Sequence, residues 1–442
     1  MKKITNWLFA AALISGTVFS MSSCSNHDEL EEDICNLTQP ITHRLTAEQA
    51  KQNALNFVNK LGTTTRANGK PLTVSDVKAI GIDKSVTRSE VDSVNLDSLF
   101  YVVNFDNNEG YVIASSDDRE TPIFAYIEDG NYNEEDTLNN GYEAFMSSLI
   151  DTEIYNRQLT ENDEKLQQSP TIPQEPIVTR FIRKEDDDED NPYNGPTIAE
   201  DKYEVMLPLL KTKWDQSAPY NKYCPGPYTG CVVTAISQIC SFLKSPNNVS
   251  WSYNGVGNSC NIDWDKIVKE CTNSYWGAPT SYDTQDQVAN LMRFWGVTFE
   301  AEYSSGGTSV NGDDAIDKLR WYGYNATKLG DYNATNVIND LKKGNSIIFM
   351  IGHARYYHVW LVVRKYVDGH AWVVDGYIDE VRSKKETIYL HCNWGWGGTR
   401  NGYFLSNVLN ADESPAIEDN KVKTRSHNYR YNLKTSTICK KN

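Results

Sequence analysis

The sequence predicts an α+β protein built from two folded units, and three observations support this prediction. Residues 45–167 contain, in order, a helical pattern, several short strand patterns and a second helical pattern. Further along, residues 231–243 repeat apolar side chains at helical spacing, and residues 369–377 and 388–394 have the pattern of buried strands. Between the two units, residues 168–200 are rich in proline and acidic residues. Helices kept apart from antiparallel strands are typical of the α+β class.

Length, charge and cysteine spacing indicate which kinds of partner, such as nucleic acids and metal ions, the protein is not expected to bind. The chain has 442 residues, which is enough for two or three domains with sizeable cores. Its formal net charge of −16 argues against nucleic-acid binding, because contacts to phosphate need basic patches. The nine cysteines form no CxxC pair, and no histidine lies at zinc spacing. We therefore expect no metal site and no cofactor.

Residues 1–23 resemble a bacterial lipoprotein signal peptide. Lys2 and Lys3 precede an apolar stretch at 8–19 that is too short to span a bilayer. The segment Met21–Cys24 resembles a lipobox, which predicts that Cys24 is lipidated after cleavage. Residues 24–42 would then be an acidic, solvated tether. We expect an exported protein that is lipid-anchored in the envelope, on the periplasmic or surface face of the outer membrane. The alternative is ordinary signal cleavage and free secretion.

Residues 43–167 form the first predicted domain. We expect a helix over 45–62, strands at 74–80, 100–105, 111–115 and 123–127, and a helix over 142–167. Asn107 to Gly110 predict the turn of a hairpin. The residues alone do not exclude an unrelated binding domain.

Cys231 is the residue with the clearest chemical signal. It follows Thr229 and Gly230 and begins the apolar helical run, and a helix N-terminus favours the thiolate form of a cysteine. Thr229 is the expected helix cap. Cys240 lies deep in the same helix, and Cys224 precedes a proline in a loop, so both are weaker nucleophiles. A cysteine at a helix start is, by itself, more often a packing residue.

A histidine and an amide follow in an order that suits thiol catalysis. His370 begins the strand at 369–377, and Asn393 and Trp394 end the strand at 388–394. An imidazole can take the proton from a thiol, and a side-chain amide can hold the ring in the useful tautomer. His353 also lies between Gly and Ala, but no Val-Val-Asp-Gly-Tyr follows it. His391, on an apolar strand, is expected to be structural.

This order of residues resembles that of papain-like proteases, and the motifs resemble the streptopain family of cysteine peptidases, in particular its members from Bacteroides-type bacteria. The matching segments cover residues 203–410. They are Pro208-Leu209-Leu210, Trp214-Asp215-Gln216, Pro219-Tyr220-Asn221, Cys224-Pro225, Thr229-Gly230-Cys231, Asp263-Trp264, the 288–296 helix, Gly323-Tyr324, Gly369-His370-Ala371 and Asn393-Trp394-Gly395-Trp396-Gly397-Gly398.

The resemblance implies an endopeptidase that acts on proteins or peptides and is made as a zymogen. Residues 43–167 would be the propeptide, an intramolecular inhibitor. Residues 201–442 would be a papain-like catalytic domain with a helix-rich half and an antiparallel sheet half. The linker at 168–200 carries five prolines, and its basic residues Arg180, Arg183 and Lys184 predict activation cleavage there, by the enzyme itself or another protease. A plain interdomain spacer is the alternative.

The resemblance also implies roles for individual residues. Cys231 would be the nucleophile, and His370 the general base and later the general acid. Asn393, in preference to Trp394, would orient the imidazole, and Trp396 would line the leaving-group side of the cleft. The backbone N–H of Cys231 and the side chain of Gln216 would stabilise the oxyanion.

Two other functions share these residues. A papain-like fold also carries acyltransferase or transglutaminase chemistry, where the third residue is usually Asp, so Asn393 favours hydrolysis. The second alternative is a non-enzymatic surface lipoprotein in which Cys231 is buried or disulfide-bonded. Near the C-terminus, residues 429–433 predict one last short strand before a loose tail.

Overall fold

The computed structural model describes residues 43–65, 71–81, 97–132, 201–358, 364–409 and 431–440, and some residues between 142 and 157. The predicted signal peptide at 1–23, the tether at 24–42 with Cys24, and the linker at 168–200 lie outside the described residues. No helix in the described ranges is both long and apolar enough to cross a bilayer.

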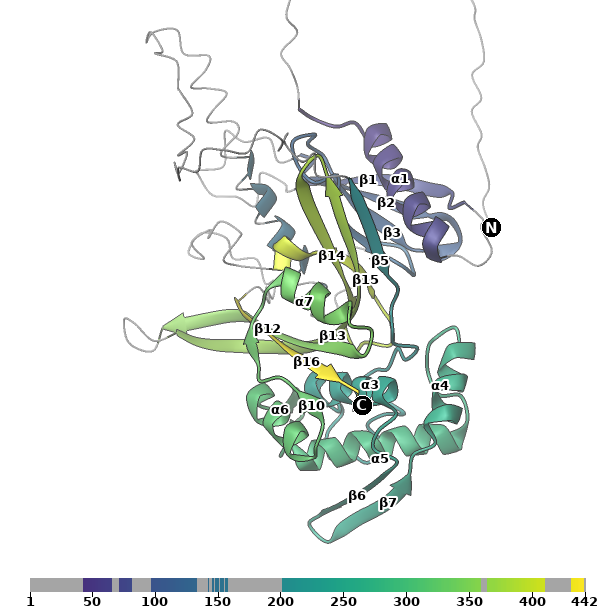
Figure 1. The fold of residues 1–442 in the computed structure, drawn as a ribbon, viewed down its shortest axis with the longest axis vertical. Coiled ribbons are helices and arrows are strands. Elements are labelled where there is room, and N and C mark those ends of the chain that lie inside the picture. The colour runs from purple at the N-terminus through teal and green to yellow at the C-terminus, as the bar shows by residue number, and fades with distance from the viewer. Residues whose placement is uncertain are drawn as a thin grey trace, which may run out of the picture. The chain divides into compact units, whose positions relative to one another are not determined.

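The first domain has the predicted arrangement. Its strands β1 (Val74–Ile80), β2 (Phe100–Phe105), β3 (Tyr111–Ser115) and β4 (Ile123–Ile127) have the predicted bounds, and they pair antiparallel in that order. The helix α1 (Ala47–Thr65) continues past its predicted end at residue 62 and packs on these strands (Figure 1). The described residues of the predicted 142–167 helix are helical.

The catalytic part divides into a helical and a sheet half, as predicted. The helical half contains α3 (Cys231–Leu243), α4 (Trp264–Asn273), α5 (Tyr282–Thr298) and α6 (Gly312–Trp321), with the hairpins β6 (Asn248–Tyr253)–β7 (Val256–Asn261) and β8 (Glu302–Ser304)–β9 (Gly307–Ser309). The sheet half contains β12 (Ser346–His358), β13 (Arg364–Arg382), β14 (Lys385–Asn393), β15 (Gly402–Leu405) and β16 (Tyr431–Cys439). Helix α7 (Ala334–Leu341) packs on β12 and β13 (Figure 1).

The strands of the two domains form one sheet, which the sequence did not predict. Its order is β1-β2-β3-β4-β15-β14-β13-β12-β16-β10, where β10 is Asn325–Ala326. The short strand β5 (Lys202–Met206) pairs with β13, and β11 (Gly330–Asp331) pairs with β16. The domains join where β4 pairs with β15, with Gly402 opposite Ile127 and Phe404 opposite Ala125. The propeptide therefore covers an edge that would otherwise expose unpaired backbone groups.

The two faces of β13 belong to different cores. Trp372 and Val374 pack with the first domain and with α7, whereas Ala371 and Val373 pack against α3 and α5. This alternation follows from the two-residue repeat of a strand. By the same alternation His370 lies on the face of Trp372, and the two rings stack.

The C-terminal strand differs from the prediction. Instead of a short strand and a loose tail, β16 runs to Cys439 and pairs with β12 along its length, with Ser346 opposite Cys439. Ile438 is fully buried. Polar residues dominate this stretch, so its own pattern does not indicate a strand inside a sheet.

Candidate active site

Cys231 is the first residue of α3, as predicted. The residue before it, Gly230, has φ 96° and ψ 144°, and a Cβ there would lie 3.1 Å from the Thr308 side chain. Only glycine suits that backbone conformation and that space. The prediction that Thr229 caps the helix is wrong, because its hydroxyl lies 2.7 Å from that of Thr234 and no side chain caps α3.

The Cys231 thiol is free and half-buried. Burial raises its pKa above the ordinary value, and the nearby backbone N–H groups of Ala371, Val232 and Cys231 partly oppose that rise. The thiol is therefore neutral in this state. Because Ala371 directly follows His370, the hydrogen bond from the Ala371 N–H also places the Cys231 thiol beside β13, the strand that carries His370.

His370 lies on β13 opposite Gly352 and is 4% exposed. Its Nε2 atom is 3.1 Å from the backbone oxygen of Trp394, and its ring stacks with Trp372 and Trp396 at centroid distances of 6.0 and 6.4 Å. Burial lowers the pKa of His370 to about 4, so the imidazole is neutral near pH 7.

The position of Asn393 corrects a prediction. Its amide nitrogen donates to the Thr212 carbonyl at 2.9 Å, and its oxygen accepts from Gln238 at 3.1 Å. The amide therefore ties the end of β14 to helix α3 and does not contact His370. The imidazole is instead held by the next backbone carbonyl, that of Trp394.

The two tryptophans of the glycine-rich turn have different surroundings. The indole of Trp394 is 1% exposed and donates to the Arg400 carbonyl at 3.0 Å, so its side chain is part of the core. Trp396 is half-buried and stacks with His370, and its predicted place on the leaving-group side of the cleft stays a prediction.

Gln216 is bound through its backbone to the segment that precedes Cys231. Its backbone oxygen accepts from the N–H of Thr229 at 2.8 Å, which holds it beside the segment that leads into Cys231. The residue is 6% exposed, and its side-chain amide makes no hydrogen bond with the described residues. The amide is therefore available to a bound carbonyl oxygen.

The remaining candidates are structural. His391 is 3% exposed, and its Nδ1 atom lies 2.6 Å from Asp375. Burial opposes its charge, but Asp375 and Glu128 prevail and raise the pKa of His391 to about 10. Burial raises the pKa of Cys240 to about 12, which makes that thiol inert at neutral pH. No three His, Cys, Asp or Glu side chains of the described part gather as metal ligands would.

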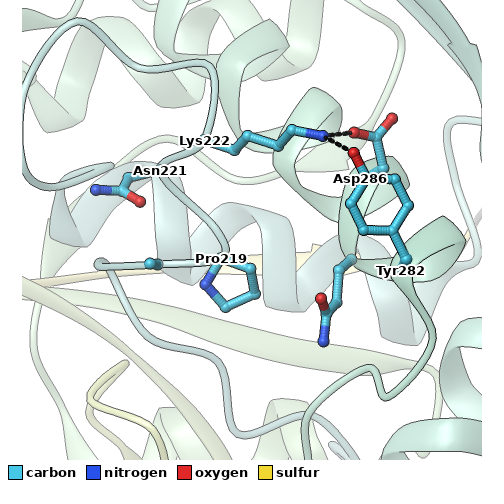
Figure 2. Close-up of a pocket in the computed structure, with 7 residues that line it drawn as sticks. Pro219, Asn221, Lys222, Tyr282 and Asp286 are labelled. Atoms are coloured by element: carbon cyan, nitrogen blue, oxygen red, sulfur yellow. Dashed lines mark hydrogen bonds and ion pairs between the residues drawn. The ribbon is translucent and has the colours of Figure 1, made fainter.

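A pocket lies beyond Gln216, between the following loop and helix α5. Lys222 closes one wall by pairing with Asp286 and with the Tyr282 hydroxyl, the latter at 3.0 Å (Figure 2). The remaining lining residues are Ala218, Pro219, Asn221 and Gln285. Because the charges of this wall neutralise each other, we assign it no catalytic role.

Comparison with known proteins identifies both domains. Residues 214–404 match the Peptidase C10 family, and residues 40–152 match the Spi protease inhibitor family. Streptopain from Streptococcus pyogenes serotype M1 is 25% identical over 406 residues, which covers 82% of this chain and 85% of streptopain. The thiol protease/hemagglutinin PrtT from Porphyromonas gingivalis is 25% identical over 395 residues, covering 83% of this chain and 39% of PrtT.

Among solved structures, a fragment of Prevotella intermedia prointerpain A aligns with a TM-score of 0.45 and 19% identity, covering 82% of this chain and 98% of the fragment. The family match at residues 214–404 includes Cys231 and His370, and the inhibitor match covers strand β4, which pairs with β15. The chain is therefore similar to the Peptidase C10 family of cysteine proteases over residues 214–404, and to the Spi protease inhibitor family over residues 40–152, ahead of that part.

Proposed function

We propose that the protein is the zymogen of an exported cysteine endopeptidase that hydrolyses peptide bonds through Cys231 and His370. The observation that carries this proposal is the placement of a free thiol at the start of α3, next to the strand segment Ala371–His370. Similarity to the Peptidase C10 family supports protein substrates, and Cys231 is a free cysteine, whereas a disulfide there would favour a non-enzymatic role.

The reaction is acyl transfer to sulfur and then to water. His370 takes the proton of the Cys231 thiol, and the thiolate attacks the peptide carbonyl carbon. Protonated His370 then gives that proton to the leaving amine as the C–N bond breaks. Water, deprotonated by His370, then hydrolyses the thioester and frees the thiol. The Trp394 carbonyl holds the Nε2 side of the ring, and we assign the proton transfers to Nδ1.

The oxyanion of each tetrahedral intermediate needs two donors. The Cys231 N–H supplies one at the helix start, and the Gln216 amide supplies the other. Replacing Gln216 by Ala should lower kcat about 10²-fold with little change in folding. A Gln216→Ala variant with wild-type kcat would remove this residue from the mechanism.

The resting state fits a zymogen because the thiol and imidazole are both neutral. Propeptide contacts to the catalytic domain support intramolecular inhibition. The β4–β15 pairing is one contact, and the Tyr275 hydroxyl, which donates to Asp129 at 2.5 Å, is another. We propose that cleavage within residues 168–200 releases this domain.

Export and anchoring are further parts of the proposal, and the N-terminal sequence supports them. The signal at 1–23 and the lipobox ending in Cys24 would place the protein in the envelope, or release it after processing. Partition of the full-length protein into a detergent phase tests this. Cys24→Ser should move the protein to the aqueous phase, whereas an unchanged partition would exclude a lipid at Cys24.

The decisive experiment is casein hydrolysis by residues 25–442 under reducing conditions, with N-terminal sequencing of any product. The matched controls are Cys231→Ala and Cys240→Ala, two cysteines of the same helix. We expect wild type and Cys240→Ala to mature near residues 180–202 and digest casein, and Cys231→Ala to stay full-length and inactive.

If wild type stays intact, the propeptide is removed by limited trypsin treatment, and casein hydrolysis is measured again. Absence of casein hydrolysis after that removal would overturn the proposed endopeptidase function. Activity retained by Cys231→Ala would instead overturn the assignment of the nucleophile.

A further inference from the structure

The pocket beyond Gln216 has an apolar lining, although most of the residues around it carry polar groups. Lys222 extends from the loop to helix α5, where its ammonium binds Asp286 and the Tyr282 hydroxyl (Figure 2). The ammonium also lies 4.7 Å from the centroid of the Tyr282 ring. The charge is therefore satisfied within the wall, and the methylene stem of Lys222 is left to line the pocket.

The two amides of the lining are bound in a similar way. The side-chain nitrogen of Asn221 donates to the Pro227 carbonyl at 2.7 Å, and that of Gln285 donates to the Pro279 carbonyl at 3.2 Å. The pocket has a volume of about 230 Å³. An apolar cavity of about 150 Å³ already binds benzene. The pocket is therefore large enough for an aromatic or a large aliphatic side chain.

The pocket lies close to the candidate oxyanion donor. Ala218 follows Gln216 by two residues, so their Cα atoms are at most about 7 Å apart. The Gln216 carbonyl accepts from the Thr229 N–H at 2.8 Å, in the segment that leads into Cys231. The Asn221 side chain is bound to the same segment, two residues before Thr229. The loop that forms the pocket is thus tied at two points to the chain that carries the nucleophile.

The chain segment just before the pocket packs against the turn that carries Trp396. In this turn, the Gly397 N–H donates to the Trp214 carbonyl at 3.1 Å. The neighbouring Lys213 donates its N–H to the Gly277 carbonyl at 2.8 Å, and the chain after Gly277 leads into helix α5 and the pocket wall. Trp396 and the pocket therefore belong to one continuous surface built around this segment.

The hairpin β8–β9 forms a different flank of the nucleophile. The Thr308 hydroxyl donates to the Tyr228 carbonyl at 2.6 Å, and the Thr308 side chain occupies the space over Gly230. The segment that leads into Cys231 therefore has this hairpin as one neighbour and the chain before the pocket as another. Because the resemblance implies that Trp396 lines the leaving-group side of the cleft, we place the pocket on that side too.

We propose that the pocket binds an apolar side chain, preferably an aromatic one, of the protein substrate on the C-terminal side of the cleaved bond. An extended peptide advances about 3.3 Å per residue. A pocket about 7 Å beyond Gln216 therefore suits the second or third residue after that bond. The rings of Pro219 and Tyr282 in its wall make these two residues the determinants of specificity. This inference rests on the proposed endopeptidase function.

The test measures kcat/KM of the mature enzyme, prepared with trypsin if self-processing fails, on a series of peptides. Each peptide carries Phe in place of Ala at one position, from three residues before the cleaved bond to three after it. Tyr282→Ala removes one wall of the pocket, Ala218→Trp fills it, and Tyr282→Phe keeps the ring. The matched control is Trp321→Ala on helix α6, because Trp321 and Tyr282 are similarly exposed, at 81% and 75%.

We expect wild type to cleave the peptide with Phe at the second or third position after the bond about tenfold faster than the Ala peptide, measured as kcat/KM. Tyr282→Ala should reduce this preference to about threefold, and Ala218→Trp should abolish it. Tyr282→Phe and Trp321→Ala should retain it, since the apolar wall is intact in both.

A wild-type enzyme without any preference for Phe after the bond would overturn the proposal, and so would a preference that Ala218→Trp leaves unchanged. If these variants instead alter selection before the bond, the assignment to the leaving-group side is wrong.

A binding measurement separates this inference from the endopeptidase function. Isothermal titration of the same peptides into trypsin-processed Cys231→Ala reports on the pocket without turnover, and the Phe peptide should bind about tenfold more tightly than the Ala peptide. Equal affinities would contradict the pocket assignment. If mature wild type hydrolyses no peptide while Cys231→Ala still prefers the Phe peptide, the endopeptidase function fails and the pocket assignment stands.

Discussion

His370 and His391 lie on neighbouring strands of the same sheet and are almost equally buried, at 4% and 3% exposure, yet their chemistry is opposite. His370 is surrounded by two indole rings and one backbone carbonyl, and burial lowers its pKa to about 4. For His391, burial is outweighed by Asp375 and Glu128, which raise the pKa to about 10. Burial alone therefore says nothing about charge; the nearest polar groups decide it.

The comparison also separates a catalytic from a structural environment. A ring that must accept and release protons gains from being neutral and weakly held, whereas a ring in a buried ion pair is fixed in its charged form. Four predictions test this distinction, in order of decreasing expected effect.

The largest effect is expected for His370→Ala. In the mature enzyme, prepared with trypsin if self-processing fails, kcat/KM on casein-derived peptides should fall at least about 10³-fold, because the thiol loses its base. The unfolding free energy should change little, since one hydrogen bond is lost. Retention of more than a tenth of the activity would show that another group acts as the base.

The next effect concerns the ion pair of His391. Asp375→Asn removes the charge 2.6 Å from the imidazole and leaves only the Glu128 carboxylate, 3.5 Å from Nε2. The unfolding free energy should fall by about 3 kcal/mol, because a buried cation loses its nearer partner. This unfolding free energy is measured by urea denaturation in the Cys231→Ala background, which prevents self-digestion. The control Asp313→Asn removes an exposed charge 3.6 Å from Lys434 and should cost less than about 0.5 kcal/mol. A similarly small loss for Asp375→Asn would mean that the pair is not stabilising.

The two histidines should limit stability at opposite ends of the pH range. Folding raises the pKa of His391, so its protonated ring adds to the unfolding free energy when the pH is below the unfolded-state pKa near 6.5. This contribution is lost as the pH rises through the folded-state pKa of about 10. Folding lowers the pKa of His370, so its neutral ring keeps its full contribution to the unfolding free energy above the unfolded-state pKa near 6.5. This contribution is lost as the pH falls toward the folded-state pKa of about 4.

In the Cys231→Ala background, His370→Gln should therefore reduce the loss of unfolding free energy between about pH 7 and about pH 5 by about 2 kcal/mol. The matched measurement is urea denaturation at both pH values. An identical acid dependence in the two proteins would contradict the neutral, buried state of His370.

The smallest effect on activity is expected for Asn393→Ala. Its amide holds Thr212 and Gln238, so its loss should cost about 1–2 kcal/mol of stability and change kcat less than about threefold. Kinetics over a pH series together with urea denaturation test both parts. A tenfold fall in kcat with a shifted pH profile would show that Asn393 acts on the imidazole during turnover.

Local patterns predicted most of the elements and failed where an element depends on distant partners. The strands from Val74 to Ile127 are short runs rich in β-branched and aromatic residues that end at turn residues, so their bounds could be read directly. The strand β16 is polar and gains its place from pairing with β12, far away in sequence. The junction of β4 with β15 likewise depends on an exposed edge that no local pattern reveals.

The sequence by itself determined the α+β class, the helix that begins at Cys231, and Cys231 and His370 as the candidate catalytic pair. These features depend on residue type and short-range periodicity, which a single chain displays directly. Only the tertiary structure decided that the Trp394 carbonyl and not the Asn393 amide holds the imidazole, that His391 is charged by Asp375, and that a pocket with an apolar lining lies beyond Gln216. Hydrogen bonds and charges depend on distances of a few ångströms between distant segments, and those distances exist only in the folded chain.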